Sequence, residues 1–318
     1  MSIGSVLVAT SNDKVKYDKT CKQLMANRQL LARLLKGFVP EFRDCPLEAI
    51  ENEYIEPESI RADAVPVERN LSNIEGLNTE DATANEGTVR YDVLFNAISP
   101  EEGGRIIVGL RMNVELQNDY YPGYPLEKRA LYYCARNLSS QFGTITEQTD
   151  YGKLVKVYSI WLCIGDNIPI TDANTATMYS MHEECLVGGT RKKREDYDLM
   201  TAIIIRATNK AGTDNRTIKL FANLFDSSMG YREKIEYLED EGISVRDIAK
   251  EVKAVCNLSY AIEQKGRAEG LAEGRISERN SIILRMHNLR VEEIMEYADE
   301  TRDNVIKVLK DNGYTPVF

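Results

Sequence analysis

The chain has 318 residues, of which 43% are hydrophobic and 28% are charged, and its formal net charge is -10. This length and balance predict a globular protein with one large domain or two ordinary ones. The acidic charge argues against broad, non-specific binding of polyanions, because affinity for phosphate comes from lysine and arginine. A local basic groove around an acidic metal site remains compatible with it.

Several other classes of protein are disfavoured by simple features of the sequence. The six cysteines are scattered without a C-x-x-C pair, which predicts reduced thiols in a cytoplasmic protein rather than disulfides or a zinc site. No secretory leader and no apolar run of membrane-spanning length are recognisable, so no membrane partner is expected. Two histidines leave little room for Ser-His-Asp or Cys-His catalysis, and no phosphate-binding glycine loop is present.

The first part of the chain reads as helices followed by loop. Apolar residues at helical spacing predict one helix over residues 19–38, with Gly37 as its stop, and a second, short helix over residues 45–54. The first twelve residues fit either an ordered arm or a frayed tail. Residues 56–85 are polar and broken by proline and glycine, which is typical of loop.

A β-hairpin is predicted over residues 89–117. From residue 106 onward the side chains alternate between apolar and polar, as in a strand with one buried face. A run over residues 89–97, followed by a loop with proline and glycine, predicts the partner strand. In this hairpin Asp92 is expected beside Glu115, and Gln117 shares a face with Glu115.

Two carboxylates that lie close together need an explanation, because like charges raise each other's pKa unless a cation lies between them. A hard divalent metal is one remedy, and Mg²⁺ typically takes one or two carboxylates together with substrate phosphates. A solvated polar face of the sheet is the other interpretation of the same spacing.

The middle of the chain predicts a helix and two central strands. An apolar stripe at four-residue intervals predicts a helix from Pro125 to Phe142. The nearly continuous apolar runs over residues 153–164 and 199–207 predict strands that are buried on both faces. Amphipathic patterns then predict helices over residues 216–225 and 232–239.

The dense basic cluster Arg191-Lys192-Lys193-Arg194 lies between the two predicted central strands. It fits either a loop that contacts phosphate or a solvated connection. In an otherwise acidic chain, we favour contact with nucleic acid.

The composition changes from residue 247 onward. Residues 263–275 repeat charged side chains every four residues, with glycines at 266, 270 and 274 on one helix face. Each glycine costs about 1 kcal/mol of helix stability relative to alanine, so this segment fits a linker or a self-association helix. Two or three short helices follow up to residue 309, and their mixed charges favour dimerisation or capping over DNA reading.

A turn, Tyr121-Pro122-Gly123-Tyr124, and Arg129 follow the hairpin. With Asp92 on one strand and Glu115-Leu116-Gln117 on the next, the stretch 86–136 resembles the PD-(D/E)xK nuclease superfamily. The resemblance is to the branch of recombination-promoting nucleases, also called PD-(D/E)xK family transposases. It implies a restriction-endonuclease-like α/β core, a mixed central sheet flanked by helices, over residues 1–246. A helical C-terminal extension over residues 247–318, which could make a homodimer, would follow.

The resemblance also implies a metal-dependent endonuclease that hydrolyses DNA, linked to recombination or mobile elements. Asp92, Glu115 and the backbone carbonyl of Leu116 would hold Mg²⁺, for which Mn²⁺ can substitute. Gln117 stands where the superfamily has a lysine that orients the attacking water. Glutamine can donate a hydrogen bond but brings no positive charge, so Arg129 or a second metal ion would have to supply it.

Further residues are candidates for the same site. Arg129 could contact a phosphate, and Tyr120 and Tyr124 could either stack on a base or wedge their loop onto the core. An extra acid could come from the residues Glu51, Glu53 and Glu86, although a solvated helix face and a turn explain them as well. The alternative functions are a catalytically silent nuclease fold that binds DNA or protein, and a defence nuclease that is held off until triggered.

Overall fold

The structure of the chain is a computed structural model, and it forms two compact units. The larger unit is Val15–Leu258, and the smaller one consists of Met1–Lys14 together with Ser259–Phe318. The structure describes residues 3–62, 80–83, 86–90, 92–100, 108–117, 120–141, 150–165 and 167–318, and among these the side chains of 3–12, 62, 80–90 and 108–114 are left undescribed.

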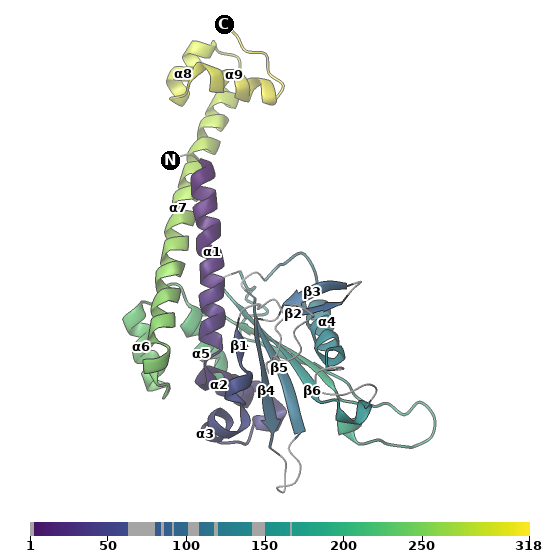
Figure 1. Cartoon of the computed structure of the whole chain (residues 1–318). Coiled ribbons are helices and arrows are strands. Elements are labelled where there is room, and N and C mark those ends of the chain that lie inside the picture. The colour runs from purple at the N-terminus through teal and green to yellow at the C-terminus, as the bar shows by residue number, and fades with distance from the viewer. Residues whose placement is uncertain are drawn as a thin grey trace. The chain divides into compact units, whose positions relative to one another are not determined.

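A six-stranded mixed sheet organises the larger unit (Figure 1). β4 and β5 are antiparallel, β5, β6 and β8 run parallel to one another, and β1 and β7 pair antiparallel at the two edges. This confirms the predicted α/β class with a mixed sheet. In spatial order the strands are β1 (Arg61–Ala62), β4 (Val93–Ser99), β5 (Val108–Gln117), β6 (Lys156–Ile164), β8 (Met200–Ala207) and β7 (Ala176–Ser180).

Helices cover both faces of this sheet, because both faces of β6 and β8 are apolar. On one face, Trp161 and Ile204 pack against α4 (Leu126–Ser139). On the other face, Tyr158, Ile160 and Ile203 belong to a core that includes side chains from several helices of this unit. These helices are α1 (Ile3–Met25), α2 (Arg28–Phe38), α5 (Arg216–Phe225), α6 (Tyr231–Asp240) and α7 (Ala249–Arg285).

The predicted first strand of the hairpin is wrong at its start. β4 begins at Val93, whereas Val89 lies in β3 (Glu86–Arg90), which pairs with β2 (Glu80–Thr83) in a separate two-stranded sheet. Asp92 lies in a bend between the two strands. The alternating pattern continues through this bend, so periodicity alone could not separate two strands that belong to different sheets.

The single helix predicted over residues 19–38 is also wrong, because α1 ends at Met25 and α2 begins at Arg28. The Asn27 side chain caps α2 by accepting a hydrogen bond from the Gln29 N–H at 3.0 Å. The apolar positions continue across the break, which concealed it. Gly37 lies inside α2 rather than after it.

A Gly37→Ala substitution is expected to lower the free energy of unfolding by about 1–3 kcal/mol, the usual cost of overpacking. An added Cβ would lie 2.6 Å from Thr217 Oγ1 of α5, which outweighs the gain of about 1 kcal/mol that alanine normally brings to a helix. At Gly270 in α7, an added Cβ meets no described atom within 4 Å. Gly270→Ala should therefore stabilise the protein. Urea unfolding followed by circular dichroism compares the two, and equal stabilisation by both would contradict the prediction.

Shorter helical segments complete the larger unit. The predicted helix over residues 45–54 is present as two consecutive segments, and α5 and α6 confirm the two amphipathic helices predicted after the central strands. The short segments are η1 (Pro40–Phe42), α3 (Leu47–Ala49), η2 (Ile50–Tyr54), η3 (Pro57–Ser59), η4 (Tyr151–Lys153), η5 (Arg194–Asp196) and η6 (Val245–Asp247).

The smaller unit has its own core. α8 (Val291–Ala298) and α9 (Arg302–Asp311) pack against the end of α7 through buried side chains that include Ile283, Ile294 and Val305. The domain boundary predicted after residue 246 falls inside η6 of the larger unit, whereas the two compact units divide between Leu258 and Ser259, within α7. Of the helices that the structure describes, none is long and apolar enough to cross a membrane.

Candidate functional site

Asp92 and Glu115 meet where β4 begins and β5 ends. The Asp92 N–H donates a hydrogen bond to Glu115 Oε1 at 3.1 Å, and the Leu116 N–H donates one to Asp92 Oδ2 at 3.0 Å. The register that pairs Val93 with Val114 sets the two acids opposite each other. Strand pairing therefore brings together the two acids that were predicted as neighbours from the sequence.

Lys22 of α1 lies against this pair of acids, a neighbour that was not predicted from the sequence. Its Nζ is 2.8 Å from Asp92 Oδ1 and 2.5 Å from Asp18 Oδ2. Only 14% of the Asp92 side chain and 21% of the Lys22 side chain are exposed, so the ion pair is largely removed from water. Seventy positions separate the two residues in the chain, and no local pattern connects them.

Burial and charge act in opposite directions on these two groups. Burial raises the pKa of Asp92 above its ordinary value, and the opposing effects of Lys22 and the Leu116 N–H do not cancel that rise. Burial lowers the pKa of Lys22, but the charges of Asp92 and Asp18 outweigh it and leave the pKa raised. Lys22 is therefore a full positive charge at neutral pH, held beside Asp92.

Glu115 is 3% exposed and faces α4, since it pairs with Trp161 in the register of β5 and β6. Burial raises the pKa of Tyr133 on α4, and the negative charge of Glu115 raises it further. Arg129 approaches from the same helix and donates to the Tyr133 hydroxyl at 2.9 Å and to the Tyr124 hydroxyl at 2.5 Å. Its guanidinium also lies over the Trp161 ring, 5.1 Å from the centroid, so aromatic groups hold this cation on the Glu115 side of the sheet.

The other predicted ligands lie in the same strand. Gln117 pairs with Cys163 and shares the face of Glu115 by the two-residue period of a strand. The Leu116 side chain points to the opposite face, where it is 8% exposed in the core. Leu116 therefore offers the site only its main chain.

The remaining candidates are placed in different surroundings. The Tyr120 hydroxyl donates to Asp172, whereas Tyr124 is 44% exposed and contacts Arg129. Glu51 and Glu53 lie in η2, where the charge of Glu51 acts on Arg33, and Glu53 is exposed. The side chain of Glu86 lies outside the described residues, and its backbone belongs to β3.

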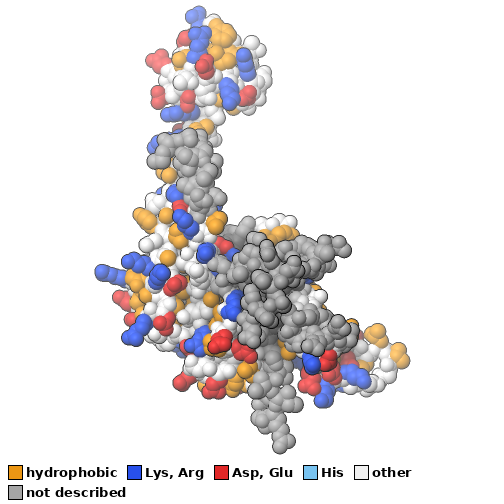
Figure 2. Space-filling view, in the orientation of Figure 1, with side chains coloured by type: hydrophobic (Ala, Val, Ile, Leu, Met, Phe, Trp, Pro, Cys, Tyr) orange, Lys and Arg blue, Asp and Glu red, His pale blue; other side chains and the backbone are white. Residues whose placement is uncertain are grey.

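The basic cluster lies in the exposed segment between β7 and β8. Lys193 pairs with Glu195 at 3.2 Å, and Arg194 pairs with Asp198 at 3.0 Å. In the part of the chain that the structure describes, the Arg191 and Lys192 side chains have no ion pair. On the face shown in Figure 2, acidic and basic side chains are interspersed rather than gathered into one basic field.

Among the described residues, no group of three or more His, Cys, Asp or Glu side chains is placed to hold a metal ion. Mg²⁺ does not require such a group, because one or two protein carboxylates suffice when waters and substrate phosphates complete its shell. Asp92 and Glu115 match that smaller donor set, and a metal ion would have to compete with Lys22 for Asp92 Oδ1.

Comparisons of the chain with protein families, curated proteins and solved structures found no match.

Proposed function

We propose that the larger unit has a restriction-endonuclease-like core and hydrolyses DNA phosphodiester bonds with Mg²⁺. The observation that carries this proposal is the direct contact between Asp92 and Glu115 across β4 and β5, with Lys22 against Asp92. Two acids and a lysine at the end of a mixed sheet form the charge set that the PD-(D/E)xK resemblance implies, although the lysine comes from a different element.

In this proposal Asp92, Glu115 and the Leu116 carbonyl would hold Mg²⁺, with Mn²⁺ as a substitute. The bound ion would polarise the scissile phosphate and lower the pKa of a water molecule. Gln117 would orient that water through a hydrogen bond. Lys22 would supply the positive charge that Gln117 lacks, by moving from Asp92 Oδ1 toward the developing negative charge on the phosphate.

Contacts to DNA would come from cations and aromatic rings near the acids. Arg129 is half-buried with its guanidinium between tyrosine hydroxyls, a position from which it could reach a flanking phosphate. Tyr124 is exposed enough to stack on a base. Tyr120 is less suited to stacking because its hydroxyl is engaged by Asp172. Of the basic cluster, Arg191 and Lys192 are the better candidates, because Lys193 and Arg194 already have acidic partners.

A catalytically silent DNA- or protein-binding module is the second candidate, and the Lys22–Asp92 ion pair favours it. An ammonium group 2.8 Å from Asp92 Oδ1 relieves the repulsion between the two acids without a metal. A nuclease held off until triggered would fit the same arrangement, with displacement of Lys22 as the activating step. In either case, self-association through the glycine-bearing face of α7 and a cytoplasmic location, in keeping with six free cysteines, belong to the proposal.

Nicking of supercoiled plasmid in Mg²⁺ or Mn²⁺ tests the proposed activity. The wild type is expected to cut the plasmid, and Asp92→Asn and Glu115→Gln are expected to lower the rate roughly a hundredfold or more, the scale of losing one electrostatic group of a catalytic site. Each variant keeps the shape of the side chain and removes its charge.

Glu241→Gln is the matched control, because Glu241 is also a largely buried acid in an ion pair, 2.6 Å from Arg216. It should cut at the wild-type rate. If the wild type cuts no plasmid with either metal but still binds DNA, the nuclease proposal is wrong and the catalytically silent module is supported. Cutting that survives both site substitutions would assign the activity to other residues.

A further inference from the structure

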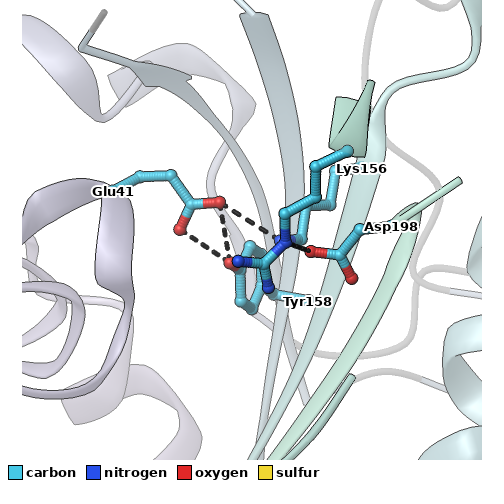
Figure 3. A network of polar contacts seen from close by, with 5 residues as sticks. Glu41, Lys156, Tyr158 and Asp198 are labelled. Atoms are coloured by element: carbon cyan, nitrogen blue, oxygen red, sulfur yellow. Dashed lines mark hydrogen bonds and ion pairs between the residues drawn. The ribbon is translucent and has the colours of Figure 1, made fainter. Parts of the chain in front are cut away.

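A second polar cluster lies at the opposite end of the central strands. Lys156 begins β6, five residues before Trp161, so at 3.3 Å per residue the cluster is about 16 Å from Glu115 along the strands. Figure 3 shows Lys156 between Glu41 and Asp198. Its Nζ is 3.3 Å from Glu41 Oε1 and 2.9 Å from Asp198 Oδ2. The Tyr158 hydroxyl donates to the same Glu41 carboxylate at 2.6 and 2.9 Å.

This cluster lines a cavity of ≈ 440 Å³ in the larger unit. That volume lies within the range of sites for small molecules, about 300–1,000 Å³. Its apolar walls are Pro40, Leu154, Met178 and Leu199. The cavity therefore combines a few converging polar groups with an apolar lining, as small-molecule sites do.

Of the charged side chains that line the cavity, that of Asp198 is the most deeply buried. Its side chain is 3% exposed, and Oδ2 accepts from both Lys156 and Arg194, whereas Oδ1 is buried without a hydrogen-bond partner among the described residues. An unmade hydrogen bond to a buried charged group is destabilising. Oδ1 itself has almost no exposed surface, so a ligand would bind this carboxylate by taking the place of Arg194 at Oδ2.

The charged side chains that line the cavity indicate the sign of the charge on its ligand. Three carboxylates line the cavity, those of Glu41, Glu195 and Asp198, against the two cations Lys156 and Arg194. The lining therefore carries one more negative than positive charge, which favours a cationic ligand. Arg194 is 68% exposed at its side chain, which makes it the group that can most easily move aside.

We propose that this cavity binds a small organic cation, with a primary ammonium or guanidinium head that donates to Asp198 and a short apolar body that packs against Leu154, Met178 and Leu199. The site lies apart from Asp92 and Glu115, and it does not depend on the proposed nuclease function.

Calorimetric titration of the full chain with three probes of one length tests this proposal. The probes are pentylammonium, pentan-1-ol and pentanoate, which share the apolar body and differ in the charge of the head. Pentylammonium is expected to bind, and the other two to bind at least tenfold more weakly, which corresponds to about 1.4 kcal/mol. Tighter binding of pentanoate, or no binding of pentylammonium, would overturn the proposal.

Three variants make the assignment specific. Asp198→Asn should weaken pentylammonium binding at least tenfold, whereas Arg194→Ala should tighten it severalfold because it removes a competing cation from Asp198. Met178→Trp fills the cavity from the edge strand β7 without altering the polar cluster, and it should abolish binding in a protein that circular dichroism shows to be folded. Unchanged affinity in Arg194→Ala and Met178→Trp would overturn the proposal even if Asp198→Asn failed to fold.

Discussion

Lys22→Met should lower metal-dependent plasmid nicking by about a hundredfold to a thousandfold, the range seen when one preorganised electrostatic group is removed from an active site. Lys22 is the cation that the structure holds at 2.8 Å from Asp92, and Gln117 cannot replace its charge. Single-turnover rates at saturating Mg²⁺ measure the effect. Binding of DNA should change much less, because one phosphate contact at most is lost.

Lys16→Met is the matched control for this prediction, since Lys16 is an exposed lysine on the same helix α1. It should leave the rate unchanged. Adding Gln117→Lys to Lys22→Met should restore part of the rate, because it returns a positive charge next to Glu115. A Lys22→Met protein that cuts within a few fold of wild type would refute the role of Lys22.

The raised pKa values of Asp92 and Lys22 determine how these two groups contribute to stability as the pH changes. Folding raises the pKa of Asp92, so the folded protein holds this proton more tightly than the unfolded chain does. The contribution of Asp92 to stability is therefore present below the unfolded pKa and lost as pH rises through the folded one. Lys22 also has a raised pKa, and its contribution is lost only as pH rises through that higher value.

Without the Lys22 ammonium, the pKa of Asp92 should rise further, since Lys22 lowers it in the wild type. The acidic limb of the pH–rate profile should therefore move to higher pH in Lys22→Met, because a protonated Asp92 cannot hold a metal ion. An acidic limb at the same pH in both proteins would show that Asp92 does not control it.

Trp161→Ala should lower the free energy of unfolding of the larger unit by about 3–5 kcal/mol, the usual cost of truncating a buried tryptophan. Trp161 is 1% exposed, its ring centroid lies 5.2 Å from that of Tyr133, and its Nε1 donates to the buried Ser159 at 2.9 Å. The substitution leaves a cavity and removes the donor to Ser159. It also removes the ring beneath Arg129.

Urea unfolding followed by far-ultraviolet circular dichroism measures this effect, because Trp161 is the only tryptophan of the chain. Trp161→Phe should cost clearly less, since it fills most of the same space. Leu186→Ala is the surface control, with a side chain that is 86% exposed, and it should stay within about 0.5 kcal/mol of wild type. A loss below 1 kcal/mol in Trp161→Ala would contradict its place in the core.

The elements that sequence predicted well are those whose pattern is local and strongly apolar. β6 and β8 are buried on both faces, and α4 and α5 each bury a stripe of side chains, so composition and period identify them. β7 was not predicted, because Ala176–Ser180 is an edge strand with alternating exposure and no strong apolar face. Its place in the sheet depends on pairing with β8, which is a contact between distant parts of the chain.

The same contrast applies to the candidate site. Asp92 and Glu115 could be predicted as neighbours because a short connection and the two-residue period of strands determine which side chains meet across a hairpin. Lys22 could not, because its distance from Asp92 depends on how α1 packs beside the sheet. Nor could the breaks at Asn27 and Asp92, since the apolar pattern continues through both.

The sequence by itself therefore determined the α/β class, the central strands with their flanking helices, and the meeting of two acids across β4 and β5. Only the tertiary structure decided that Lys22 neutralises Asp92, that aromatic rings hold Arg129, and that Asp198 lines a cavity with one unpaired oxygen. The physical reason is the range of the interactions. Backbone periodicity and strand pairing act between near neighbours, whereas each of these three arrangements depends on the packing of elements that are distant in the chain.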